Sequence, residues 1–141
     1  LKKACSNIVS SSNAQSEMIY GNQWDEVMSW LKQTVFKGQE DKVDNDSSSW
    51  GNYSNSTGNA ATGSGTKRTS GYSEYWKANN IYDLAGNCRD WTQEALNTDY
   101  RVYRGGFYEV SGSDLPASDR SYISPYHSGS YYSARPALYI K

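Results

Sequence analysis

The stretch from Ala85 to Gly106 constrains the fold more than any other part of the sequence. Ala85 to Asn87 forms a turn signal, because Gly and Asn tolerate positive φ, and Cys88 to Thr92 follows as a short segment compatible with a strand. Asn97 to Asp99 supplies a loop, after which Tyr100 to Arg104 alternates in the manner of a second strand. The pattern ends at Gly105 and Gly106 and predicts a hairpin at the centre of the domain.

A single helix is predicted upstream of this hairpin. Its apolar residues recur at positions i, i+3, i+4 and i+7: Trp24, Val27, Met28 and Leu31. Gly21 and Asn22 precede them as expected capping residues, and Gly38 is the expected end of the helix. We interpret the apolar stripe as core packing rather than as a groove for a partner.

Residues 39–75 are dominated by Ser, Asn, Gly, Asp and Thr, which admits two interpretations. Such composition is typical of disorder. Aromatic residues recur through and just beyond the segment, however, at Trp50, Tyr53, Tyr72, Tyr75 and Trp76. These anchors favour long ordered loops held against the body of the domain.

Metal and redox sites have weak support in the sequence. Asp44-x-Asp46-x-Ser48 could begin a calcium loop, but the central Gly is missing and position twelve is Asn55 instead of Glu. Cys5 and Cys88 could form one bridge, yet their spacing fits neither a metal site nor a redox motif, so we favour two separate thiols. We therefore expect no cofactor and no metal.

Charge and composition bear on the partners. The 141 residues carry 14 basic and 15 acidic side chains, a formal net charge of −1, so the positive surface that nucleic acid or an anionic membrane attracts is not expected. No apolar run approaches the ~20 residues of a membrane-spanning helix. Aromatic residues make up 14% of a chain whose apolar content is only 36%, which predicts one domain that uses Trp and Tyr both in its core and on its surface.

The C-terminal third is rich in Tyr, Ser, Gly and Asp between residues 107 and 132. Antibody binding loops use the same mixture, because Tyr offers a large contact area with few torsions to immobilise. The alternative is that these tyrosines only pack beneath a loop. Ala137 to Ile140, with Pro136 before it, is expected to form a last strand paired with the N-terminal segment, where Ile8 and Val9 are a candidate edge strand.

Four segments together resemble a known protein family. Asn80 to Trp91 is similar to its N-x-x-D-[LM]-x-G-N-V-W-E-W segment, and Arg101 to Gly106 to its R-V-x-R-G-G segment. Met18 to Leu31 resembles its P-T-E-A-E-W-E helix, and Ser133 to Pro136 takes the place of x-G-F-R. The family contains the formylglycine-generating enzymes and many C-type-lectin-fold proteins. The resemblance implies an α+β, C-type-lectin-like fold with small antiparallel sheets, one main helix and long ordered loops, in a single domain over residues 1–141 that could be the C-terminal module of a longer protein.

The resemblance also implies a function. Within this family, the variable proteins of phages and gut bacteria, diversified by retroelements, carry a variable face between constant scaffold segments. By analogy, residues 107–132 would be a binding face for a protein or glycan ligand on a cell surface. The chain itself would belong to a phage virion or to a bacterial surface or secreted protein, and the resemblance also allows an oligomer. The corresponding candidate ligand-binding residues are Phe107, Tyr108, Glu109, Val110, Asp114, Leu115, Asp119, Ser121, Tyr122, Ile123, Tyr126, His127, Ser130, Tyr131 and Tyr132.

An enzyme of the formylglycine-generating superfamily, or a structural subunit without a ligand face, is the alternative. Those enzymes use a cysteine pair near the C-terminus, and Tyr108 to Lys141 contains no cysteine. The related iron-dependent sulfoxide synthases need several histidines, whereas this chain has only His127. We therefore expect no catalysis. Arg104 and Arg135, in the scaffold segments, are expected to be partly buried and hydrogen-bonded near the core strands.

Overall fold

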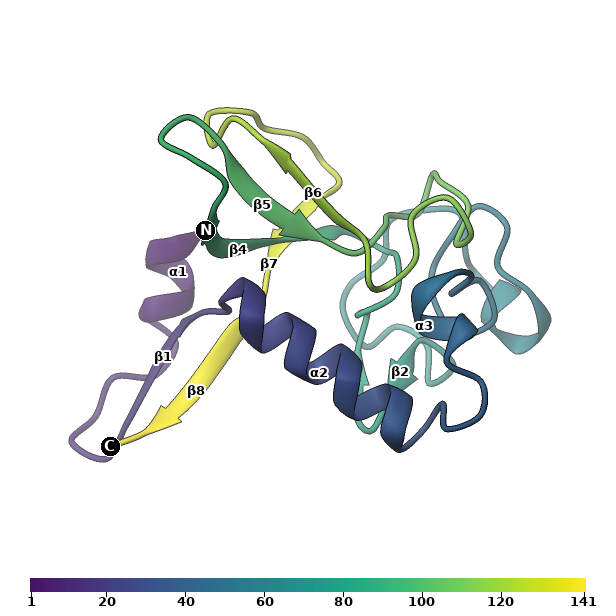
Figure 1. Ribbon diagram of the computed structural model, residues 1–141, viewed down its shortest axis with the longest axis horizontal. Helices are drawn as coiled ribbons and strands as arrows, with labels where there is room; N and C mark the ends of the chain where they lie inside the picture. Colours follow the sequence, from purple (N-terminus) through teal and green to yellow (C-terminus); the bar gives the residue numbers. More distant parts are fainter.

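The computed structural model describes all 141 residues and has an α+β architecture with few helices and three small sheets. Figure 1 shows the arrangement, with the sheet formed by β4 to β7 above the long helix α2 and a body of loops at one end. The helical elements are α1 (Lys2–Ser6), α2 (Gly21–Gln33), α3 (Asp41–Asp44) and the 3-10 turn η1 (Gly58–Ala61). The strands are β1 (Ala14–Met18), β2 (Lys77–Ala78), β3 (Ile81–Tyr82), β4 (Arg89–Ala95), β5 (Arg101–Arg104), β6 (Arg120–Ile123), β7 (Tyr132–Ala134) and β8 (Pro136–Ile140).

Helix α2 confirms the predicted apolar stripe. Trp24, Met28 and Leu31 are buried in the main core, and Val27 packs against it. The expected caps are wrong, because Gly21 already lies inside the helix and the backbone amide of Tyr20 donates to the Gln23 side chain (3.0 Å). The helix also ends at Gln33, well before Gly38, so the glycine serves the following turn.

The predicted hairpin is present as the antiparallel pair β4 and β5, in which Trp91 lies opposite Tyr103. Strand β6 adds antiparallel to β5, and β7 adds on the other side of β4, giving the order β6-β5-β4-β7. Strand β7 runs parallel to β4, so the expectation of purely antiparallel sheets is wrong for this one. Strands β6 and β7 therefore run in the same direction at opposite edges of the sheet, and residues 124–131 carry the chain from one edge back to the other.

The turn before the hairpin has the predicted positive φ, 72° at Gly86 and 60° at Asn87. The Asn87 side chain accepts a hydrogen bond from the Arg68 amide and donates one to the Arg68 carbonyl, each at 3.0 Å. It also accepts one from the side chain of Asn52 (3.1 Å). One turn residue thus ties two distant loops to the base of the hairpin.

The polar loops are ordered, as predicted. Trp50, Tyr53 and Trp76 are buried and anchor the segment, whereas Tyr72 and Tyr75 are exposed, so those two residues do not serve as the expected anchors. Tyr72 lies instead over the ring of Trp76 at 5.4 Å, on its outer side.

The N-terminal segment pairs with the last strand, as expected, but the strand is not Ile8 and Val9. Strand β1 pairs antiparallel with β8, with Ala14 opposite Ile140 and Met18 opposite Pro136. The backbone around Val9 is bound by Ser16, whose hydroxyl accepts from the Val9 amide (2.9 Å). In Figure 1 this pair and α1 project from the body on the side where both termini lie. No helix has the length and apolar character to cross a membrane.

Candidate ligand-binding face

The four-stranded sheet has two faces with different chemistry, because side chains alternate along each strand. Arg104, Arg120 and Asp90 point toward α2, since β5 pairs Arg104 with Asp90 on one side and with Arg120 on the other. Trp91 and Tyr103 point to the opposite face, where they form a second small core with Cys5 and Met18.

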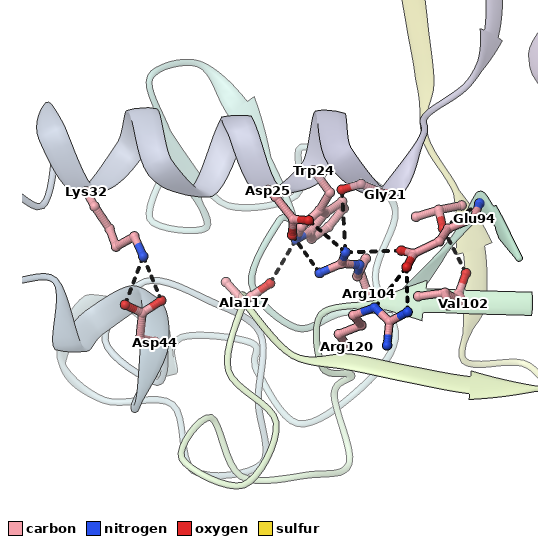
Figure 2. Close-up of polar contacts among 11 residues, drawn as sticks. Gly21, Trp24, Asp25, Lys32, Asp44, Glu94, Val102, Arg104, Ala117 and Arg120 are labelled. Carbon is pink, nitrogen blue, oxygen red and sulfur yellow. Dashed lines mark hydrogen bonds and ion pairs between the residues drawn. The ribbon is translucent and has the colours of Figure 1, made fainter. Parts of the chain in front are cut away.

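The face toward α2 is occupied by a network of ion pairs, drawn in Figure 2. Arg104 contacts Asp25 at 2.8 Å and Glu94 at 3.2 Å, and Arg120 Nε donates to Glu94 at 2.9 Å. Burial tends to raise the pKa of Glu94, but the hydrogen bond from Arg120 and the charge of Arg104 outweigh it and lower that pKa. These charges pair with one another and hold α2 on the sheet.

The opposite face carries a continuous group of aromatic side chains. The ring of Tyr108 lies 6.0 Å from that of Phe107, which lies 4.9 Å from Tyr131. Tyr131 lies 4.8 Å from Tyr132, and Tyr132 lies 5.8 Å from His127. Tyr132 continues the group to Trp91 at 5.1 Å and to Tyr103 at 5.5 Å. We call this surface the aromatic face and define it as Arg89, Trp91, Tyr103, Phe107, Tyr108, His127, Tyr131 and Tyr132.

Arg89, the first residue of β4, lies at the centre of the aromatic face. Its guanidinium carbon is 4.4 Å from the centroid of Phe107 and 4.9 Å from that of Tyr103, and its Nη1 donates to the Tyr103 hydroxyl (3.2 Å). No carboxylate pairs with it, in contrast to Arg104, Arg120 and Arg135. Stacking on these rings stabilises the cation, whose charge also opposes the rise in the pKa of Asp119 that burial causes.

The structure brings five of the seven predicted aromatic and histidine positions into this one group: Phe107, Tyr108, His127, Tyr131 and Tyr132. Tyr122 is not among them. It pairs with Val102, which puts it on the α2 side of the sheet, where it contacts Tyr100 at 5.6 Å. Tyr126 is 95% exposed at the tip of the loop between β6 and β7 and contacts no other ring.

Several other predicted residues have structural roles instead. Val110 packs against the main core and Ile123 against the second core, because both segments return to the body of the domain there. Asp119 accepts a hydrogen bond from Ser121 (3.2 Å), and burial raises the pKa of Asp119.

The remaining predicted residues divide between a separate turn and the open surface. Asp114 and Leu115 lie in a turn begun by Ser111, which Asn55 binds at 3.1 Å, and neither residue belongs to the aromatic face. Glu109 and Ser130 are exposed.

Arg89, Trp91 and Tyr103 were not among the predicted ligand-binding residues, because they belong to the central hairpin and the predicted binding face covered only residues 107–132. The signal was available in the hairpin, where residues two apart on a strand share one face. Arg89 with Trp91 and Arg101 with Tyr103 therefore had to point to the same side.

A pocket of about 420 Å³ adjoins the aromatic face. It lies between α1, β4, β5 and the loop that precedes β7. Its lining includes Lys2, Trp91, Gln93, Arg101, His127 and Tyr132. This volume is within the range of small-ligand sites, about 300 to 1,000 Å³.

A second pocket, of about 360 Å³, lies on the other side of β7 near Asp83 and Arg135. Arg135 donates to Asp90 (3.3 Å) and to the backbone carbonyls of Tyr82 (3.0 Å) and Asp83 (3.1 Å), so the expectation that Arg104 and Arg135 are hydrogen-bonded near the core strands is confirmed. Asp83 accepts from Ser70 through one carboxylate oxygen, while the other is buried without a partner, and burial raises the Asp83 pKa.

Cys5 and Cys88 are both free thiols. No three His, Cys, Asp or Glu side chains come together in a way that could hold a metal ion. Asp44, from the weak calcium pattern, forms an ion pair with Lys32 (3.0 Å), and Asp46 accepts from the Ser48 amide (2.9 Å). Comparison with protein-family models, with curated proteins and with solved structures finds no match for this chain.

Proposed function

We propose that this chain is a non-catalytic ligand-binding module with a C-type-lectin-like fold, which presents its aromatic face to a protein or glycan ligand on a cell surface. Its setting would be a phage virion or a bacterial surface or secreted protein. The observation that carries the proposal is the aromatic face itself, where side chains from three separate segments meet around the guanidinium of Arg89.

The chemistry of the aromatic face suits recognition. Phe107, Tyr108, Tyr131 and Tyr132 are half-buried, so their rings are held in place while part of each remains accessible. Such preordered aromatic residues lose little conformational freedom on binding, and Tyr and Arg are enriched among the residues that dominate binding energies. Contiguous exposed apolar patches on protein surfaces often mark interaction sites.

The fold assignment rests on the resemblance of the four segments together with the arrangement they adopt. The segment Asn80 to Trp91 supplies the turn and the first strand of the hairpin, and Arg101 to Gly106 supplies the second strand. The chain ends join in β1 and β8, beside the central sheet, and long ordered loops pack on the helix side.

The non-catalytic assignment is supported by the surroundings of His127. Its ring lies edge-on to Tyr132 and has no hydrogen-bond partner, so no acid or nucleophile is coupled to it. The carboxylates that do bind a serine hydroxyl, such as Asp90 with Ser133 (2.7 Å), have no histidine nearby to complete a nucleophilic site.

The test is binding of the fluorescently labelled domain to a panel of bacterial cells, measured by flow cytometry. Tyr131→Ser is expected to weaken labelling of any cell type that the parent recognises by about thirtyfold, as for a residue at the centre of an interface. Tyr75→Ser is the matched control, because it makes the same change at a tyrosine that is even more accessible (54% exposed) but lies in the loop body, away from the aromatic face. Equal effects of the two substitutions, at unchanged melting temperature, would refute the proposal.

A further inference from the structure

The pocket beside the aromatic face has an unusual charge balance. Its twelve lining residues include two cations, Lys2 and Arg101, and no carboxylate. Gln93, which lines the pocket, donates to the carboxylate of Glu17 (3.3 Å), but Glu17 itself does not line the pocket. An anionic group placed here meets positive charge without competition from an acidic side chain of the protein.

Both cations retain free donors. Arg101 uses Nη1 to bind the backbone carbonyls of Asn97 and Tyr100, at 2.9 and 3.0 Å, while its Nε and Nη2 have no partner in the protein. Lys2 makes no side-chain hydrogen bond and no ion pair. The backbone contacts position the Arg101 guanidinium, whose planar arrangement of donors matches a carboxylate.

The rest of the lining defines the shape of the group that carries this charge. The pocket is bounded by the stacked rings of Trp91 and Tyr132, whose centroids lie 5.1 Å apart. Ser128 adds a hydroxyl without a partner in the protein, and Gln93 adds an amide whose nitrogen donates to the Met18 carbonyl (2.8 Å). The Thr92 hydroxyl is already bound to the Val102 carbonyl (3.0 Å), and only four of the twelve lining residues are hydrophobic. A pyranose ring has both properties, since its C–H groups pack on aromatic rings while its hydroxyls form hydrogen bonds. The side chain of Phe, Asp or Glu has only one of these two properties.

We infer that this pocket binds an acidic saccharide, with the sugar ring against Trp91 and Tyr132 and its carboxylate held by Arg101 and Lys2. The inference rests on the proposed function and makes it more specific, because it identifies the ligand as a glycan that bears a uronic acid or a similar carboxylated sugar.

The probes are glucuronate, glucose, which has the same ring without the carboxylate, and phenylacetate, which has a carboxylate on an aromatic ring. Binding is followed by the NMR chemical shifts of the protein amides during titration. Glucuronate is expected to bind saturably and at least about tenfold more tightly than glucose, because a charged hydrogen bond is lost in glucose. Phenylacetate is expected to bind more weakly than glucuronate.

The substitution Lys2→Gln is expected to weaken glucuronate binding about fivefold, and Arg101→Gln about tenfold or more. Lys3→Gln is the matched control, since it makes the same change on the neighbouring residue of α1, which does not line the pocket. Lys2→Gln also tests the inference if Arg101→Gln fails to fold. Raising the salt concentration should weaken glucuronate binding and leave glucose binding unchanged.

Three results would overturn the inference: glucose binding as tightly as glucuronate, Lys2→Gln behaving like Lys3→Gln, or phenylacetate binding where glucuronate does not. The last result would assign the pocket to a protein side chain. These failures differ from a failure of the proposed function, because cell labelling that depends on Tyr131 would persist without glucuronate binding.

Discussion

Replacing Arg104 is expected to destabilise the fold more than replacing any of the more exposed charges. Its side chain is only 4% exposed and bridges α2 to the sheet through Asp25 and Glu94, as Figure 2 shows. Breaking a buried ion pair typically costs about 3 to 5 kcal/mol, because the remaining charge is left unpaired. Here Asp25 is 60% exposed and Glu94 keeps its contact with Arg120, so both remain solvated or paired. We therefore expect Arg104→Ala to lose about 3 kcal/mol, at the lower end of that range.

Thermal and urea unfolding followed by circular dichroism measure this loss. For a domain of this size, about 3 kcal/mol corresponds to a fall in melting temperature of roughly 10 °C. Arg104→Met should lose less than Arg104→Ala, because it keeps the apolar stem in place. Lys32→Ala is the control, since the pair of Lys32 with Asp44 is partly exposed and is worth at most about 1 kcal/mol. If Arg104→Ala and Lys32→Ala shift the melting temperature equally, the network does not hold α2 on the sheet.

Three further predictions concern single residues. Asp83→Asn is expected to stabilise the fold by about 1 kcal/mol at pH 7, because an amide loses less on burial than the carboxylate. Burial raises the pKa of Asp83 in the folded state, so the parent protein loses stability as the pH rises above about 3.9, the pKa of an unfolded Asp. The stability gained by Asp83→Asn should therefore vanish below about pH 4, which urea unfolding at a series of pH values measures. Gly86→Ala should lower the free energy of unfolding, measured in urea, by about 3 kcal/mol, because φ is 72° and the added Cβ would overlap the Asn52 carbonyl oxygen. A loss below about 1 kcal/mol would contradict the turn geometry. Tyr126→Ala should change stability by less than about 0.5 kcal/mol, whereas Tyr132→Ala should cost about 2 kcal/mol through lost packing on Trp91; similar losses in calorimetry would show that the two tyrosines are equally buried.

The sequence predicted the elements whose signals are local. The 3.6-residue period of Trp24, Met28 and Leu31 is a property of one helix, and it placed those residues in the core correctly. The turn at Gly86 and Asn87 and the alternation up to Arg104 likewise depend on neighbouring residues, and the hairpin formed as predicted.

The α+β class, which the resemblance to the family implied, is confirmed, whereas the specific C-type-lectin-like fold stays a prediction. The predicted ends of the elements were less accurate. Gly38 was expected to end the helix, which in fact ends at Gln33, because a glycine that tolerates positive φ can end a helix or form part of a later turn.

The candidate site depended on information that no local pattern contains. Composition indicated that the tyrosines of residues 107–132 could bind a ligand, but the face to which each one points depends on the register of its strand. Tyr122 lies on the α2 side because it pairs with Val102, while Tyr132 lies on the other side because it pairs with Arg89. The parallel pairing of β7 also brings Tyr131 beside Arg89, 42 residues earlier in the chain. Only tertiary structure could decide these contacts, since a shift of one residue in strand register would move every side chain to the opposite face.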